Sequence, residues 1–199
     1  NIYSHTGQIN KNEIELLTKI NSSNNLIPLT QTQALIISNN SSKGVFLRGY
    51  DNNYININHF LNKKIIEGRI FKNNLNDVVI GYVLANKFNL TVGDKIKVAI
   101  PKTDKTIFGN IPRFKTLIIS GIFNFGMYEY DANFVFTHST IANKLLLLNE
   151  DSFNQIEIFL PDPDQINIIQ NEIIYQIKSN DLNLYISSWK ENNSALINA

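Results

Sequence analysis

The chain has 199 residues, of which 43% are hydrophobic and 18% charged, and its net charge is +1. This length suits one domain or two small subdomains, and the scattered, balanced charge argues against a nucleic-acid binder, which carries a basic stripe. The chain has no cysteine, which excludes a disulfide and a thiolate metal site, and no apolar run approaches the length that spans a bilayer.

The N-terminal segment is predicted to form a strand, a helix and a second strand. Residues Asn1–His5 give the first strand. Asn10 and Glu13 have the spacing of a capping box, which marks the start of a helix. The remaining elements expected here are the end of the helix at Asn21–Asn25, a strand over Leu29–Ile37 and a turn over Ser38–Gly44.

The middle of the chain is predicted to consist mostly of strands. A short helix over Gly81–Phe88 ends at Asn89, because asparagine tolerates the left-handed conformation that follows many helices. A second helix is expected over Ser139–Leu148. Tyr54–Phe60 is either a strand or the start of an irregular segment. The other predicted strands are Gly44–Tyr50, Ile96–Ile100, Phe114–Phe123 and Phe134–Thr137.

The C-terminal segment repeats the order strand, helix, strand. Alternating hydrophobic residues over Gln155–Leu160 predict a strand. Asp162 and Gln165 have capping-box spacing around Pro163, so a helix is expected to begin there. The helix carries an apolar stripe of isoleucines, and Leu182–Ile186 alternates as the last strand.

A β-α-β unit therefore occurs at each end of the chain. Two such units can pair into one sheet with two helices on one face, which is the ferredoxin-like split βαβ arrangement. The predicted class is α+β, with a discontinuous subdomain made of residues 1–43 and 150–199. A β-rich second subdomain, residues 44–149, is inserted between its halves.

The sequence offers no pattern typical of a catalytic or metal site. His5, His59 and His138 lack the spacing of a metal motif, which favours surface or capping histidines. Glu129 and Asp131 form a conceivable acid–base pair, but without a basic or nucleophilic companion a polar turn with aromatic packing is favoured. No nucleophile elbow, P-loop or dinucleotide motif occurs. A non-catalytic domain without metal or cofactor is predicted.

The strongest functional candidate is the segment Pro101–Pro112. A connection of about twelve residues without internal structure is uncommon and is often functional. Its apolar tip would need a partner to cover it, and the alternative is an ordinary long hairpin whose apolar residues fold back on the core. The tip residues are Ile107, Phe108, Gly109 and Ile111, and the surrounding cations are Lys97, Lys102, Lys105, Arg113 and Lys115.

Several motifs together resemble a known family. They are "GVFLRGYD", "IIEGRIF", "DVVIGYVLANKFNLTVGDKIKV", "IPRFKTLIISGIFNFGMYEYD" and "SSWKENNSALINA". Their order is similar to the extracytoplasmic domain of LolC/LolE-type permeases of the lipoprotein-releasing LolCDE transporter, within the MacB/FtsX-like permease group. The resemblance covers nearly the whole chain and is strongest from Gly44 to Leu148. It implies that residues 1–43 and 150–199 form a Porter-type subdomain and residues 44–149 a β-rich Sabre-type subdomain.

The resemblance also implies a binding surface. In LolC-type members a protruding hairpin, the Hook, and an adjacent basic Pad capture the periplasmic carrier LolA. The Hook falls on Pro101–Pro112 and the Pad on Lys97, Phe114 and Lys115, with Arg113 as a further cation. Ile107 stands where a proline is expected and Phe114 where a polar amide is expected. LolE-type members lack the Hook, so the two bounding prolines favour the LolC-like role.

The function implied by the resemblance is recognition and force transmission on the periplasmic face of a bacterial inner membrane. The expected partners are a LolA-like carrier, a lipoprotein substrate, a LolD-like ATPase in the cytoplasm and a second permease subunit. Membrane helices are expected before Asn1 and after Ala199. The first alternative is another MacB/FtsX-like export permease that meets a different periplasmic adaptor. A remote alternative is a soluble hydrolase with a dispersed carboxylate site.

Overall fold

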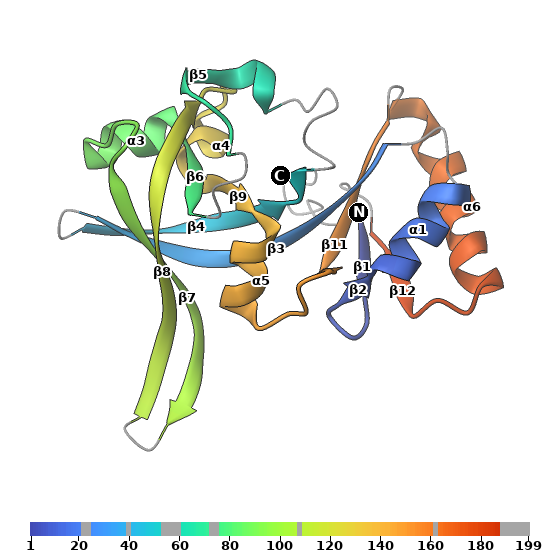
Figure 1. Ribbon diagram of the computed structural model, residues 1–199. Helices are drawn as coiled ribbons and strands as arrows, with labels where there is room; N and C mark the ends of the chain where they lie inside the picture. The colour runs from blue at the N-terminus through green and yellow to red at the C-terminus, as the bar shows by residue number, and fades with distance from the viewer. Residues whose placement is uncertain are drawn as a thin grey trace, which may run out of the picture. The chain divides into compact units, whose positions relative to one another are not determined.

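The computed structural model describes residues 1–20, 25–38, 41–52, 61–71, 76–106, 109–160 and 163–187. The chain divides into two compact units (Figure 1): the first comprises Asn1–Leu29 and Asp151–Ala199, and the second Thr30–Glu150. Strand β3 (Asn25–Ser38) contributes residues to both units. The boundary expected after residue 43 would place all of β3 in the first unit. The structure instead divides the chain within β3, between Leu29 and Thr30.

The first unit is a four-stranded antiparallel sheet with helices on one face (Figure 1). Its strand order is β12 (Leu184–Ile186), β1 (Ile2–Ser4), β11 (Gln155–Phe159) and the start of β3. The helices are α1 (Lys11–Ile20) and α6 (Ile166–Ser179). Because β11 lies between β1 and β3, the two βαβ units interleave, and the predicted split βαβ arrangement is confirmed. A short ladder joins β2 (Ile9–Asn10) to β10 (Ser152–Phe153).

Local capping fixes the start of α1 as predicted. The Asn10 backbone N–H donates to Glu13 Oε2 over 2.8 Å, and the Glu13 N–H donates to Asn10 Oδ1 over 3.0 Å, which is a reciprocal capping box. At the second helix Pro163–Gln165 form a 3₁₀ turn and α6 begins at Ile166. Asp162, predicted to cap this helix, lies outside the described residues.

The second unit is built on a ring of paired strands. Its order is β3, β4, β9, β6 and β8, and β7 closes the ring because it pairs with both β8 and β3. β4 runs parallel to β9, and β6 runs parallel to β8. The strands are β4 (Ser41–Tyr50), β6 (Asp77–Gly81), β7 (Lys95–Thr106), β8 (Gly109–Phe123), β9 (Phe134–His138) and a short edge strand β5 (Ile65–Gly68) beside β8.

A single apolar core holds this ring together. Alternate residues of the strands are fully buried, including Ile36, Leu47, Val98 and Leu117. Burial of this apolar surface is the main stabilising contribution. The short helical segments whose bounds the structure describes in this unit are η1 (Asn62–Lys64), α3 (Tyr82–Phe88), α4 (Tyr128–Asn133) and α5 (Ser139–Leu146).

Most element predictions in the second unit are confirmed, and the differences outside Pro101–Pro112 concern the end of α5, the start of β4 and helix α4. Asn89 ends α3 with a left-handed φ of 52°, as expected, whereas α5 ends at Leu146 because Leu147 takes the left-handed conformation. The turn predicted over Ser38–Gly44 is wrong for most of its length, because β4 already begins at Ser41. Glu129 and Asp131, for which the sequence favours a polar turn, lie on helix α4. The segment Tyr54–Phe60 lies outside the described residues.

No helix within the described ranges is long and apolar enough to cross a bilayer.

Candidate partner-binding site

The hairpin of β7 and β8 is the most distinctive feature of the second unit. Figure 1 shows the far ends of these two strands extending beyond the other strands of the unit. Pairing continues from Lys95↔Ile118 to Thr106↔Gly109. The expectation of a structureless loop over Pro101–Pro112 is therefore wrong: both prolines lie within strands. Among the described strands none pairs with the outer side of the far part of the hairpin, so both of its strands are edges there, and edge strands accept proline.

The ladder is irregular where the hairpin leaves the ring. Ala99 pairs with Phe114 and Thr103 with Pro112, so residues 100–102 of β7 lie opposite Arg113 alone. Extra residues on one strand form a bulge, which bends that strand and redirects the residues beyond it. Pro101 cannot donate a ladder hydrogen bond, which accounts for the interruption at this place.

The predicted tip is described only in part. Ile107 and Phe108 lie outside the described residues. For Gly109, Ile111 and Pro112 the structure gives the backbone, with Gly109 opposite Thr106 and Ile111 opposite Asp104. The role of these residues therefore remains a prediction from the sequence.

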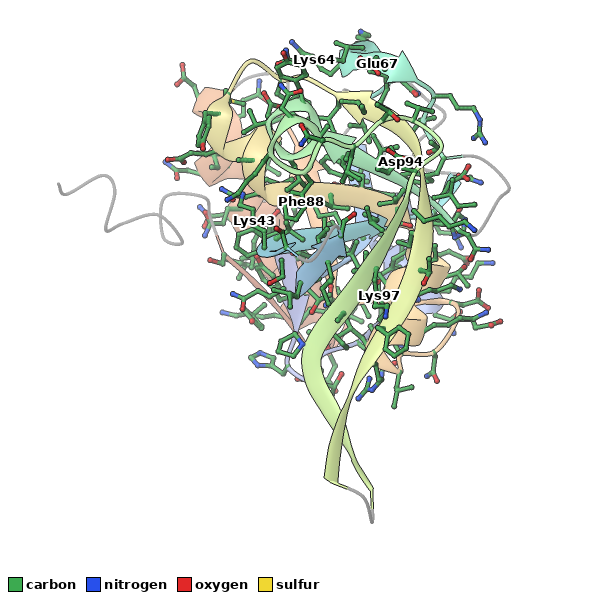
Figure 2. The ribbon with its side chains drawn as sticks, turned by 90° about the vertical axis from the view of Figure 1, so that its left-hand side faces the viewer. Lys43, Lys64, Glu67, Phe88, Asp94 and Lys97 are labelled. Carbon is green, nitrogen blue, oxygen red and sulfur yellow. The ribbon has the colours of Figure 1, made fainter. Side chains whose placement is uncertain are left out.

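The base of the hairpin presents an exposed aromatic ring with a cation above it. Lys97 Nζ lies 4.6 Å from the centroid of the Phe114 ring, which is within cation–π range. Phe114 is 56% exposed, and Figure 2 shows Lys97 on the hairpin near the ring of strands. Lys115 is half-buried and follows directly on β8. Lys97 and Phe114 are therefore brought together, whereas Lys115 pairs with the buried Val98 and lies on the other face of the hairpin.

Arg113 is placed differently from the other predicted cations. Its Nη1 donates to the backbone carbonyl oxygen of Leu145 over 2.6 Å. Leu145 is in the last turn of α5, where carbonyl groups without intrahelical partners favour a positive charge. Arg113 thus braces the hairpin against α5.

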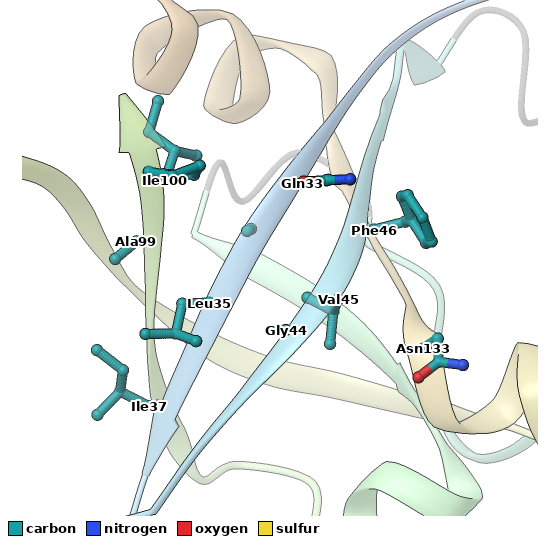
Figure 3. A pocket seen from close by; sticks show the side chains of 11 residues that line it. Gln33, Leu35, Ile37, Gly44, Val45, Phe46, Ala99, Ile100 and Asn133 are labelled. Atoms are coloured by element: carbon teal, nitrogen blue, oxygen red, sulfur yellow. The ribbon is translucent and has the colours of Figure 1, made fainter. Parts of the chain in front are cut away.

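An apolar groove of about 600 Å³ adjoins the base of the hairpin (Figure 3). Its walls come from β3, β4 and β7, and Pro101 marks its end toward the hairpin. Leu35 and Phe46 are partly exposed in it, at 39% and 37%. No charged side chain lines the groove among the residues that the structure describes. The remaining described lining is Gln33, Ala34, Ile37, Gly44, Val45, Ala99, Ile100 and Asn133.

Sequence reasoning missed this groove. Residues 34–37 form a continuous apolar run in which Ala34 and Ile36 are buried, Leu35 and Ile37 are more exposed, and all except Ile36 line the groove. A strand that is apolar on both faces is the available signal. The signal does not show which strands lie beside it, and the groove needs three of them.

The carboxylates considered for acid–base chemistry serve the local structure. Asp131 is buried, and its two oxygens accept from the backbone N–H groups of Phe125, over 2.8 Å, and Gly126, over 3.2 Å. Glu129 is exposed. Asp131 thus stabilises from helix α4 the backbone that precedes the helix, and the expected aromatic packing is present, since the Tyr130 and Phe134 rings stack with their centroids 4.6 Å apart. Within the described part of the chain, no group of three or more metal-ligating side chains occurs.

Among the described residues of the second unit, the surroundings shift the pKa of Lys43 and of His138. Burial, and then the charge of Lys87, lowers the pKa of Lys43, whose Nζ donates to the Ala132 carbonyl and to Asn133 Oδ1. Burial lowers the pKa of His138, although the charge of Asp51 opposes this shift. His138 Nδ1 accepts from the Thr140 N–H at the start of α5, so it is a capping histidine.

Comparison with known proteins supports the resemblance found in the sequence. Residues 3–175 match the family model described as MacB-like periplasmic core domain. The chain is 25% identical over 123 residues to the lipoprotein-releasing system transmembrane protein LolC of Neisseria meningitidis, covering 62% of this chain and 29% of that protein. It is 26% identical to LolC of Buchnera aphidicola over 161 residues, covering 80% and 39%. The chain therefore spans well under half of these curated relatives.

Two solved structures have the same fold. The extracellular domain of the noncanonic ABC-type transporter YknZ from Gram-positive bacteria matches with a TM-score of 0.59 and 10% identity, covering 94% of this chain and 100% of that one. The periplasmic region of MacB from Actinobacillus actinomycetemcomitans matches with a TM-score of 0.57 and 14% identity, covering 100% and 92%. At these identities the likeness concerns the fold alone.

Proposed function

Because the chain belongs to the family of MacB-like periplasmic core domains, and is of the LolC/LolE type, we propose that it is the periplasmic domain of a lipoprotein-releasing ABC-transporter permease in a bacterial inner membrane. In this proposal a LolD-like ATPase and a second permease subunit complete the transporter. The domain itself carries out no catalysis. It receives a LolA-like carrier, which takes the lipoprotein released from the membrane.

The observation that carries this proposal is the β7–β8 hairpin. It extends beyond the ring of strands and has exposed Phe114 and Lys97 at its base. A projecting arm reaches a partner that a flat surface would hold at a distance. The curated relatives are named as lipoprotein-releasing proteins, which favours a lipoprotein carrier as that partner.

The residue chemistry gives each part of the hairpin a role. The apolar tip, Ile107, Phe108 and Ile111, anchors the carrier by burying apolar surface, which is typical of interface centres. Lys97 and Lys115 orient an acidic edge of the carrier and mainly raise the association rate. The groove beside Pro101 accepts apolar side chains of the same partner, and Arg113 holds the arm in position.

A binding titration tests the proposal. The wild-type chain is immobilised and titrated with the lipoprotein carrier of the same organism. Phe108→Asp places a carboxylate in the proposed apolar contact, and we expect the Kd to rise by about a hundredfold or more, because an unpaired buried charge costs several kcal/mol. The melting temperature should stay unchanged.

Ile168→Asp is the matched control, because Ile168 is 69% exposed on α6 in the other unit. It should bind the carrier as the wild type does. Equal affinity of Phe108→Asp and wild type would remove the hairpin tip from the interface.

A second candidate is an export permease that meets a different periplasmic adaptor. The shared fold with the periplasmic region of MacB favours it. Absence of carrier binding by the wild type, together with binding of an adaptor protein, would select this candidate.

A further inference from the structure

Two peptide segments connect the units, and one side chain is bonded to both. The crossings are Leu29–Thr30 in β3 and Glu150–Asp151. Thr30 Oγ1 donates to Asn143 Oδ1 over 2.6 Å. Asn143 Nδ2 donates to the carbonyl oxygens of Asn149, over 3.1 Å, and Glu150, over 3.2 Å. A single amide on α5 therefore ties the second unit's ends of both connections together.

The bond between Thr30 and Asn143 is shielded from water, whereas the bonds to Asn149 and Glu150 are partly buried. Thr30 is 0% exposed and Asn143 is 1% exposed. A buried polar group without a partner is costly, so breaking the bond between Thr30 and Asn143 is strongly opposed. A movement of β3 at Thr30 should therefore also move Asn143, and with it α5, while the Glu150 connection is held to Asn143 by a partly buried bond.

The last turn of the same helix, which also contains Asn143, is bonded to the hairpin. Arg113 Nη1 donates to the carbonyl oxygen of Leu145, which is two residues after Asn143 on α5. Arg113 lies opposite residues 100–102, where the hairpin leaves the ring. The helix also packs against β4, β7, β8 and β9, and Figure 1 shows it beside β7 and β8.

We propose that α5 is a mechanical relay that couples the two inter-unit connections to the base of the hairpin. Asn143 is its input and Arg113 its output. The helix is short and packed on both strands of the hairpin, so a displacement at Thr30 or Glu150 moves the contact at Leu145. This inference deepens the proposed function, since the hairpin is the arm assigned there to the carrier.

A double-mutant cycle with hydrogen exchange as the readout tests the relay without any carrier. Thr30→Val removes the hydroxyl donor at the input, and Arg113→Met removes the output bond. We expect Thr30→Val to raise exchange of the backbone amides of residues 113–117 by about three- to tenfold when Arg113 is present. In the Arg113→Met background the same substitution should have no further effect on these amides.

Three controls keep the outcome decisive. Thr30→Ser retains the hydroxyl and should restore wild-type exchange. Lys115→Met makes the same charge change two residues along β8, and the response to Thr30→Val should persist in it. The amides of β6 should not respond, because β6 makes no part of the relay.

Several outcomes would overturn the relay. They are an unchanged exchange rate at residues 113–117, an equal increase with and without Arg113, and an equal increase at β6 that indicates general loosening. These outcomes leave the proposed function standing, because the carrier titration is a separate measurement. Failure of that titration likewise leaves the exchange result intact.

Discussion

At the scale of single residues, several polar side chains in the second unit stabilise the fold by hydrogen bonds to nearby backbone groups. His138 shows this most clearly. Its ring lies at the start of α5, where Nδ1 accepts from the Thr140 N–H. This bond requires an unprotonated Nδ1, and burial lowers the pKa of His138 in the same sense, with the Asp51 charge as an opposing influence. The folded chain therefore binds a proton at His138 less readily than the unfolded chain.

This difference predicts how stability depends on pH. The stabilising contribution of neutral His138 is complete above the ordinary histidine pKa of about 6.5. It is lost as the pH falls from that value toward the lower pKa of the folded state, because the unfolded chain then takes up the proton first. His138→Asn keeps a capping oxygen and cannot titrate. We expect the loss in free energy of unfolding between about pH 7.5 and pH 5 to be smaller in this variant.

Urea unfolding at both pH values measures this difference. If the wild type and His138→Asn lose the same free energy of unfolding on acidification, His138 does not contribute to the pH dependence.

At the scale of elements, close packing between α5 and β4 positions the helix. Gly49 of β4 faces α5 so closely that an added Cβ would lie 2.7 Å from the Ala142 Cβ and 2.9 Å from the Ser139 Cα. Only glycine allows this approach. The packing of α5 on β4 determines the positions of Asn143 and of the Leu145 carbonyl. It therefore also positions the hydrogen bond between Arg113 and Leu145.

Gly49→Ala should therefore move α5 away from β4. We expect the free energy of unfolding to fall by about 1–3 kcal/mol, which is usual for overpacking. Gly44→Ala is a matched control on the same strand, because its Cβ would meet no atom within 4 Å. Chemical denaturation should show no more than about 0.5 kcal/mol of change for the control. Equal free energies of unfolding for the two variants would contradict close packing of α5 against Gly49.

The elements differ in how far the sequence predicts them, and the reason is the range of the interactions that form them. The start of α1 is predictable because Asn10 and Glu13 bond to each other's backbone three residues apart. The continuation of β7 past Pro101 is not predictable from the local sequence. It depends on pairing with β8 and on the bulge between Ala99 and Thr103, which form only when the two strands come together. Asn143 gives no signal either, since its partners Thr30 and Glu150 meet only in the folded unit.

At the scale of the whole molecule, the ring of the second unit and its projecting arm are separable. The ring closes through the pairing of residues 35–37 with 97–99 and of residues 95–99 with 114–118. None of these pairs involves residues 101–112. The arm is therefore not needed for closure, and its retention in the fold calls for a function outside the ring, which the proposed carrier contact supplies.

Excision of the arm tests this separation. Residues 101–112 are replaced by Asn-Gly, so that Ile100 and Arg113 flank a two-residue turn of the kind that matches the twist of paired strands. The free energy of unfolding should change by no more than about 1 kcal/mol, because the ring pairs and the buried core stay in place. Carrier binding should be lost, since the proposed anchors are removed while Lys97 and Phe114 remain. A shortened chain that folds and still binds the carrier with wild-type affinity would place the interface elsewhere on the unit, and one that fails to fold would show that the arm helps to hold the ring closed.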